Sequence, residues 1–259
     1  MTDGFTFEHL GLRGEIRMVR PNRATITRRW MTALALVAVA CGNEPRSDAV
    51  RDGIKNSPPG VATAEVRQTV MFLGTSLTAG YGLSPDEAFP ARIQTRIDSL
   101  GLPFRVVNAG VSGETSAGAL RRIDWLAQQG PLAVLVVETG ANDGLRGQSV
   151  DSLRSNLRRV LTRALALDPR PVVIVAGMEA PPNLGQRYAS EFRTVFPEIA
   201  DEFKVIYLPF LLNGVAGTDR LNQRDGIHPT AEGAMQVAEN VWQTLGPILD
   251  SIARVPANP

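Results

Sequence analysis

From about residue 66 onward, the chain alternates short apolar runs with longer segments of helical period. The apolar runs lack the strict polar alternation of a half-exposed strand, so they predict β-strands that are buried on both faces. These predicted strands are Thr69–Leu73, Phe104–Asn108, Ala133–Thr139, Pro171–Gly177 and Lys204–Leu208. The segments between and after them predict helices at Ala88–Leu100, Ser116–Gln129, Val150–Leu167, Gln186–Phe203 and Thr230–Leu249.

The predicted helices are amphipathic, and the third shows the pattern most clearly. Its apolar positions fall on one helical face: Leu153, Leu157, Val160, Leu161, Ala164 and Leu165. Five strands, each followed by a helix, predict an α/β fold with a five-stranded parallel sheet and helices on both sides. Functional sites in such sheets form beyond the carboxyl ends of the strands, so candidate catalytic residues should lie just after strands.

A turn rich in glycine and small residues, Gly74–Gly82, follows the first predicted strand. Gly74 permits a tight turn, which places Ser76 at the crevice and near the start of a helix. There the backbone N–H of Ser76 could face a developing oxyanion, with its hydroxyl as a candidate nucleophile. A serine beside a glycine turn is more often a helix N-cap, so this turn alone is a weak signal.

The second and third predicted strands end in similar turns, Asn108–Thr115 and Glu138–Gly144. Each turn supplies a candidate oxyanion donor, the backbone N–H of Gly113 and the side-chain amide of Asn142. Two glycine turns with a capping asparagine are an equally ordinary interpretation of either turn alone. That interpretation weakens because both turns are predicted at the same end of the sheet as Ser76.

A fourth segment, Asp225–Pro229, lies just before the last predicted helix. An aspartate three residues before a histidine, on a turn made pliable by Gly226, can bring its carboxylate to the imidazole and fix the tautomer. The chain has only two histidines, and the other is His9 near the N-terminus. His228 is therefore the candidate general base of the domain, with Asp225 as its partner.

Composition narrows the function classes. The 259 residues are 44% hydrophobic and 20% charged, which is typical of a globular protein. With 27 basic and 26 acidic residues, there is no charge excess that would favour nucleic acid as a partner. We therefore expect a small-molecule substrate. The oligomeric state is left open.

Two other chemistries receive little support. Glu138 and Asp143 are carboxylates near the predicted crevice, and a glycosidase needs such a pair. Nothing else in the sequence favours that reaction. One histidine with scattered carboxylates does not make a recognisable metal site, so we expect neither a metal nor another cofactor.

The N-terminal segment has the layout of an export signal. The apolar run Trp30–Ala40 follows a basic segment with Arg20, Arg23, Arg28 and Arg29, and its 11 residues are too few to span a bilayer. Small residues then lead to Cys41, the only cysteine, in a pattern that resembles a bacterial lipobox. We expect an extension and signal or lipoprotein peptide over 1–41, a polar linker over 42–66, the domain over 67–252 and a tail over 253–259. The expected location is periplasmic or membrane-anchored through lipidated Cys41.

The four blocks together resemble the SGNH, or GDSL-type, hydrolase family, which is named for a Ser, a Gly, an Asn and a His in separate blocks. They correspond to Ser76, Gly113, Asn142 and His228, in order, and the resemblance covers about residues 69–249. Within the family, the blocks are most similar to the bacterial group of multifunctional acyl-CoA thioesterase I/lysophospholipase L1 and its arylesterase relatives.

This resemblance implies a three-layer α/β/α, flavodoxin-like fold and a serine hydrolase mechanism. Ser76 would attack the acyl carbon, and His228, oriented by Asp225, would take and return the proton. The N–H groups of Ser76 and Gly113 and the amide of Asn142 would form the oxyanion hole. The family's usual Gly-Asp-Ser-Leu is Gly-Thr-Ser-Leu here, so Thr75 leaves the triad complete and changes how the turn is held.

We expect hydrolysis of carboxylic esters or thioesters with a moderately apolar acyl group, through an acyl-Ser76 intermediate. The segment Thr115–Leu120 and the loop Ala180–Tyr188 are candidates for lining the acyl site. Deacetylation of carbohydrates, which the same family also performs, is the alternative reaction. A non-catalytic surface lipoprotein that uses the fold as a binding module is an alternative of another class, and the complete set of blocks argues against it.

Overall fold

The computed structural model describes residues 67–254. The predicted extension and signal peptide (1–41), with Cys41, and the predicted linker (42–66) lie outside the described residues. So do residues 255–259 of the predicted tail. Within residues 67–254, no helix has both the length and the apolar character needed to cross a membrane.

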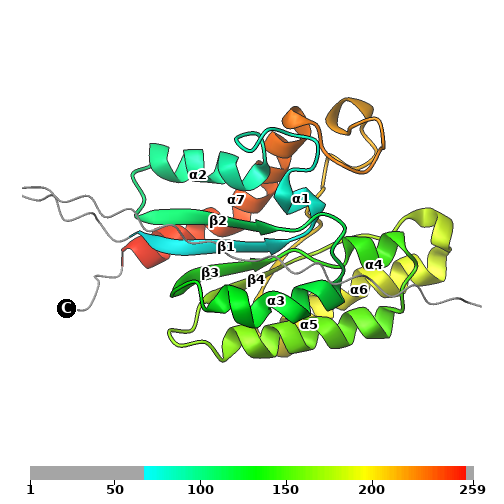
Figure 1. Ribbon diagram of the computed structural model, residues 1–259. Coiled ribbons are helices and arrows are strands. Elements are labelled where there is room, and N and C mark those ends of the chain that lie inside the picture. Colours follow the sequence, from blue (N-terminus) through cyan, green and yellow to red (C-terminus); the bar gives the residue numbers. More distant parts are fainter. Residues whose placement is uncertain (1–66, 255–259) are drawn as a thin grey trace, which may run out of the picture. The chain divides into compact units, whose positions relative to one another are not determined.

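Five parallel strands form one sheet in the order β2-β1-β3-β4-β5. The strands are β1 (Gln68–Gly74), β2 (Phe104–Gly110), β3 (Leu132–Val137), β4 (Val172–Ala176) and β5 (Ile206–Leu208). The five-stranded parallel sheet predicted from the sequence is thereby confirmed (Figure 1). The last strand is shorter than predicted, because Lys204 ends the preceding helix in a left-handed conformation, with φ of 53°.

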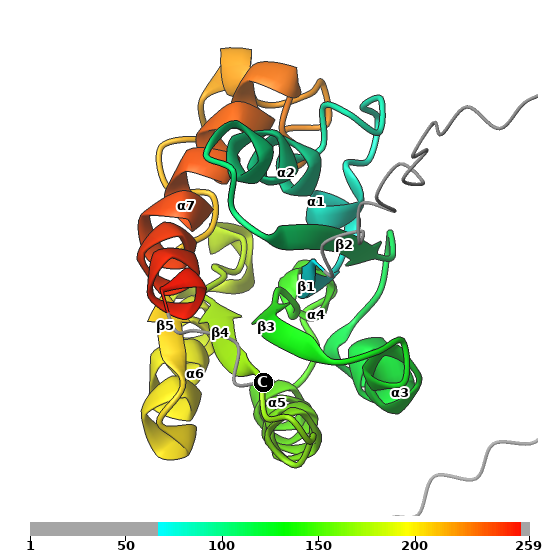
Figure 2. The ribbon, with the colours of Figure 1, turned by 90° about the vertical axis from the view of Figure 1, so that its left-hand side faces the viewer.

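Helices cover both faces of the sheet, as predicted (Figures 1 and 2). Helices α2 (Phe89–Ser99) and α7 (Ala231–Ala253) pack together on one face. Helices α3 (Ser116–Ala127), α5 (Val150–Leu165) and α6 (Gln186–Phe203) cover the other face. The result is a three-layer α/β/α arrangement, and α7 continues one residue past the predicted domain end at residue 252.

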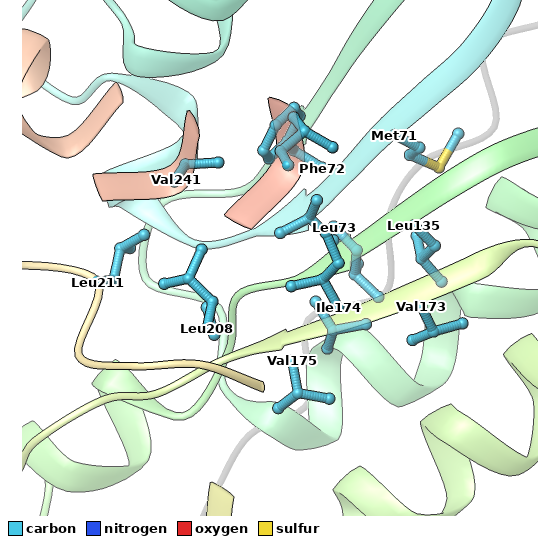
Figure 3. Packing of buried hydrophobic residues seen from close by; sticks show 14 of the residues in the cluster. Met71, Phe72, Leu73, Leu135, Val173, Ile174, Val175, Leu208, Leu211 and Val241 are labelled. Atoms are coloured by element: carbon cyan, nitrogen blue, oxygen red, sulfur yellow. The ribbon is translucent and has the colours of Figure 1, made fainter. Parts of the chain in front are cut away.

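The core lies between the sheet and its two helical layers (Figure 3). Residues 70–73 of β1 are completely buried, so this strand presents apolar side chains to both layers. The predicted apolar face of α5 faces the core: Leu153, Leu157, Val160, Leu161 and Ala164 are buried. Because successive strand side chains point to opposite faces, a central strand must be apolar throughout when both faces are covered.

The prediction that every strand is buried on both faces is wrong for β2. This strand lies at the edge of the sheet, and most of its residues are half-buried or exposed. Side chains satisfy two of its backbone N–H groups, since Val106 donates to Oε1 of Gln94 at 2.5 Å and Gly110 donates to Oδ1 of Asn108 at 3.0 Å. An edge strand whose donors are occupied is a poor template for pairing with another chain.

The order of the strands places a crevice at the carboxyl ends of β1 and β3. The chain passes from β1 to β2 on one side and then crosses to β3 on the other side. Binding sites form at such a switch point because the connections diverge there. Two short helices that the sequence patterns did not predict as separate elements, α1 (Ser76–Ala79) and α4 (Ala141–Leu145), begin at this crevice.

Candidate active site

Ser76 is the first residue of α1 and follows β1 after a single connecting residue, Thr75. A Cβ at Gly74 would lie 1.9 Å from the hydroxyl of Thr78, so only glycine fits at this turn. Thr75 is the N-cap of α1, and its hydroxyl accepts a hydrogen bond from the N–H of Leu77 at 3.5 Å. The predicted turn thus places Ser76 at the start of a helix, beside the crevice.

His228 joins Ser76 to Asp225 through two hydrogen bonds of its imidazole ring. Nε2 of His228 lies 2.9 Å from Oγ of Ser76, and Nδ1 lies 2.7 Å from Oδ2 of Asp225. A carboxylate only accepts, so Nδ1 carries the proton and Nε2 offers its lone pair to the serine hydroxyl. The three residues, separated by up to 152 positions in the chain, form one continuous chain of hydrogen bonds.

The Asp225 carboxylate is held in place by its own turn. Its Oδ1 accepts from the backbone N–H groups of Ile227 and His228, both at 3.0 Å, while Oδ2 faces the imidazole. Burial acts to raise the pKa of Asp225, but the hydrogen bonds from the His228 ring and from the two N–H groups lower it to about 2. Asp225 is therefore ionised at neutral pH.

Asn142 lies on α4 and lines the same cleft as Ser76. One hydrogen of its amide donates to the carbonyl of Glu114 at 2.9 Å, which fixes the orientation of the amide. The second hydrogen is left for a ligand, because an amide nitrogen carries two donors.

Gly113 lies in the loop between β2 and α3, with φ of +79°, which glycine adopts readily. Its carbonyl accepts from Arg146 at 2.9 Å. Within residues 67–254, the N–H groups of Ser76 and Gly113 have no hydrogen-bond acceptor in the protein. Gly113 does not line the cleft described below, so its part in oxyanion binding stays a prediction.

A cleft of about 330 Å³ opens beside Ser76. Its walls are mainly apolar and come from α1, α4 and the loops after β4 and β5: Leu77, Ala141, Leu145, Met178, Ala180, Pro181, Pro182, Phe210, Leu212, Ala216 and Ile227. The predicted loop Ala180–Tyr188 contributes three of these residues. The other predicted wall, Thr115–Leu120, does not line the cleft. Ser116 instead donates from its N–H and its hydroxyl to the carboxylate of Asp143, and α3 runs along one face of the sheet (Figure 1).

A larger hollow, of about 850 Å³, lies at the opposite ends of the strands. It is lined by residues such as Gln68, Leu132 and Val172, near the amino ends of β1, β3 and β4. None of the predicted site residues lines it. The smaller cleft, which contains Ser76 and Asn142, is therefore the candidate active site.

Glu138 is the site residue whose part sequence reasoning missed. It follows β3 directly, and its N–H donates to the carbonyl of Leu73 in β1 at 2.8 Å. Its fully buried carboxylate accepts from the N–H of Thr75 at 2.7 Å, from the Thr75 hydroxyl at 2.9 Å and from the Thr78 hydroxyl at 2.8 Å. Burial raises the pKa of Glu138 to about 7, against the hydrogen bonds, which lower it. A charged residue at the end of a strand buried on both faces was the available signal.

The paired-carboxylate alternative fails on the same geometry. Glu138 and Asp143 are 0% and 1% exposed, and neither lines the cleft. Asp143 instead accepts from the N–H of Ser116 at 2.8 Å and from its hydroxyl at 2.5 Å. Both carboxylates hold backbone turns in place. In residues 67–254 there is also no group of three or more His, Cys, Asp or Glu side chains that could hold a metal ion.

Comparison with known proteins places this geometry in a family. The sequence pattern of the GDSL-like lipase/acylhydrolase family matches residues 72–235. Esterase TesA of Pseudomonas aeruginosa is 40% identical over 182 residues, which are 70% of this chain and 90% of that protein. Thioesterase 1/protease 1/lysophospholipase L1 of Escherichia coli K12 is 34% identical over 187 residues, 72% of this chain and 88% of that protein.

Solved structures show the same relationship. A crystal structure of TesA matches with a TM-score of 0.67 and 39% identity, over 70% of this chain and 99% of that one. The psychrotrophic esterase EstA from Pseudoalteromonas sp. matches with a TM-score of 0.67 and 31% identity, over 71% and 99%. On its sequence and its fold, the chain belongs to the GDSL-like lipase/acylhydrolase family and is a carboxylic ester hydrolase.

Proposed function

We propose that Ser76 is the nucleophile of this hydrolase, His228 its general base and Asp225 the residue that orients the base. In the first step, the proton of the Ser76 hydroxyl passes to Nε2 of His228 while Oγ bonds to the acyl carbon. The bond from that carbon to the leaving oxygen or sulfur then breaks, and the leaving group takes the proton from Nε2. The observation that carries this proposal is the hydrogen-bonded chain of the three side chains, at 2.9 and 2.7 Å.

The second step releases the acyl group. A water molecule gives a proton to Nε2 of His228 while its oxygen attacks the carbon of acyl-Ser76. The tetrahedral intermediate collapses, the carboxylic acid leaves, and Ser76 regains its proton. Throughout, the ionised Asp225 stabilises the imidazolium that forms in each step, since an opposite charge at 2.7 Å favours the cationic ring.

Three donors are proposed to hold the negative oxygen of each intermediate: the N–H groups of Ser76 and Gly113 and the side-chain amide of Asn142. The two N–H groups have no protein acceptor within residues 67–254, and the amide has one hydrogen beyond its bond to Glu114. Donors that are fixed before the reaction stabilise a developing charge without reorganisation. Asn142 also lies in the cleft with Ser76, where a substrate carbonyl would have to lie.

The proposed substrates are esters or thioesters with a moderately apolar acyl group. The cleft beside Ser76 is lined mainly by aliphatic, methionine, proline and phenylalanine side chains, and Glu179 and Asn222 are its polar residues besides Ser76 and Asn142. A mainly apolar wall favours a hydrocarbon chain over a sugar with many hydroxyls. This supports acyl ester hydrolysis over carbohydrate deacetylation. The hydrogen-bonded chain of Ser76, His228 and Asp225 argues against a non-catalytic binding module, because a protein that only binds does not need it.

A series of substrates tests this choice. Initial rates on para-nitrophenyl acetate, butyrate and octanoate, together with release of acetate from acetylated xylan, compare the two reactions on one protein sample. We expect kcat/KM to be highest on an ester longer than acetate and the xylan to be a poor substrate. A strong preference for the xylan would replace the proposed substrate class and leave the roles of the triad unchanged.

We also propose that the protein is exported and anchored to a membrane through lipidated Cys41, with residues 42–66 as a tether and the catalytic domain beginning at about residue 67. The basic segment, the short apolar run and the single cysteine after small residues support this. Expression of the full chain in a bacterium, with fractionation and labelled fatty acid, tests the anchor. We expect labelled protein in the membrane fraction for the wild type and none for Cys41→Ser. Equal labelling of the two proteins in that fraction would contradict the proposed anchor.

A further inference from the structure

Tyr81 holds an unusual position for a large aromatic residue. It follows α1, five residues after Ser76, and 53% of its surface is exposed, so burial gives little reason for its presence. Its ring contacts the imidazole of His228, with 4.6 Å between the ring centroids and a tilt of 40°. Aromatic pairs within this range attract each other. Two residues from the segment after β1 therefore contact His228: Ser76 binds its Nε2, and Tyr81 packs against one face of its ring.

Gln223 fixes Tyr81 against the loop that carries His228. The Nε2 amide of Gln223 donates to the carbonyl of Tyr81 at 2.7 Å and to the carbonyl of Pro229 at 2.9 Å. The backbone N–H of Gln223 donates to the carbonyl of His228 at 2.7 Å. One side chain thus ties two segments that lie 142 positions apart in the chain.

The loop with His228 is closed at its base as well. Asn222 and Pro229 form an antiparallel bridge, and the N–H of Thr230 donates to the carbonyl of Leu221 at 2.9 Å. The loop is thereby a short closed segment, with its two ends joined and Asp225 and Gly226 at its tip. Little freedom remains for the imidazole except rotation of its own side chain, and the face of Tyr81 opposes that rotation.

We propose that Tyr81, held by Gln223, is a positioning residue for His228: its ring keeps the imidazole in line with Ser76 and stabilises the imidazolium formed during acyl transfer. The inference rests on the proposed role of His228 as general base. The physical basis is that the face of an aromatic ring carries negative electrostatic potential and attracts a cation. The ring contributes most when His228 is protonated, which occurs in the tetrahedral intermediates, so its loss should lower kcat more than it raises KM.

Substitution to Leu and to Phe separates the aromatic face from the hydroxyl. Within residues 67–254, the Tyr81 hydroxyl makes no hydrogen bond to the protein, so Tyr81→Phe keeps every interaction that the proposal uses. Tyr81→Leu keeps an apolar side chain but removes the ring. Loss of a cation–π contact at an exposed site predicts a fall in kcat of about two- to fivefold for Tyr81→Leu.

The experiment measures kcat and KM of the full chain on para-nitrophenyl butyrate, with folding checked by circular dichroism. Expected results are a lower kcat with KM within about twofold for Tyr81→Leu and near wild-type values for Tyr81→Phe. Trp125→Leu is the matched control, because Trp125 is an aromatic residue that is 61% exposed on α3 and does not line the cleft. Gln223→Leu, which releases Tyr81, should show the same signature as Tyr81→Leu.

Three results would overturn the inference: a wild-type kcat for Tyr81→Leu, an equal fall for Tyr81→Phe, or a rise in KM without a change in kcat, which would make the ring a substrate contact. A folded Ser76→Ala variant measured alongside keeps the two proposals apart. If Ser76→Ala is inactive and Tyr81→Leu is normal, only the role of Tyr81 fails. If Ser76→Ala is active, the proposed mechanism itself fails.

Discussion

The hydroxyl of Thr75 donates a hydrogen bond of 2.9 Å to the buried carboxylate of Glu138, and the N–H of Thr75 donates a second of 2.7 Å to the same group. The residue before Ser76 is thus tied twice to the end of the neighbouring strand β3. The oxygens of this carboxyl group have enough lone pairs to accept both bonds. Thr75, which replaces the aspartate usual in the family, supplies a neutral donor instead of a second negative charge.

Replacement of Thr75 by valine removes this hydroxyl while keeping the shape of the side chain. We expect Thr75→Val to lower the free energy of unfolding by about 1 to 3 kcal/mol, because a buried carboxylate loses one of its donors. Urea unfolding followed by circular dichroism measures it. Thr75→Ser retains the hydroxyl and should stay within about 1 kcal/mol of the wild type; a loss for Thr75→Ser with none for Thr75→Val would show that the methyl group matters and the hydrogen bond does not.

Titration of Glu138 lowers the free energy of unfolding as the pH rises. Burial raises its pKa to about 7 from the ordinary value of 4.5. A raised pKa means that the folded protein holds this proton more firmly than the unfolded chain. The stabilisation from Glu138 is therefore fully present below about pH 4.5 and is lost as the pH rises through about 7.

Glu138→Gln removes this titration, because glutamine resembles the protonated acid and does not ionise. We expect the stability of the variant, relative to the wild type, to improve as the pH rises from 5 to 8. Chemical unfolding of both proteins at a series of pH values measures the difference. A difference that stays constant across this range would contradict the raised pKa of Glu138.

Asn142 gives a quantitative test of the proposed oxyanion hole. Removing one such donor costs about 10²- to 10³-fold in kcat, so we expect a loss of this size for Asn142→Ala. Asn240→Ala is the matched control, since Asn240 also donates to backbone carbonyls, those of Leu211 and Asn213, but lies on α7. A wild-type rate for folded Asn142→Ala would remove Asn142 from the oxyanion hole.

Ala180 offers a test of the acyl cleft, because it lines the cleft and its side chain is small. A tryptophan at this position would fill part of the space of about 330 Å³. We expect Ala180→Trp to reduce kcat/KM on the octanoate ester much more than on the acetate ester. The acetate rate serves as the internal control, and equal reductions on both esters would place the acyl chain elsewhere.

Much of the fold follows from the pattern of the sequence. The continuous apolar runs around Met71, Leu135 and Ile174 predict central parallel strands, because only strands covered on both faces need them. The same reasoning failed for β2, where Val106 and Val107 form an apolar run that lies half-exposed at the edge. Strand order, which decides which strand is at the edge, is not encoded in the local period of hydrophobicity.

In the candidate site, too, only contacts between residues close in the sequence could be predicted. Asp225 and His228 are three residues apart, so their contact could be expected from local geometry, and the structure places them 2.7 Å apart. The contacts of Thr75 with Glu138 and of Tyr81 with His228 join segments 63 and 147 positions apart, which approach only once the sheet and its loops have formed. No local pattern in the sequence encodes those two distances.

The central claim, that Ser76 is the nucleophile, is tested most directly by Ser76→Ala. The measurement is kcat on para-nitrophenyl butyrate, with circular dichroism and urea unfolding to establish that the variant is folded. Losing one member of such a triad removes on the order of 10⁴-fold or more, and the account predicts a loss of that size. A folded variant with a rate near that of the wild type would contradict it.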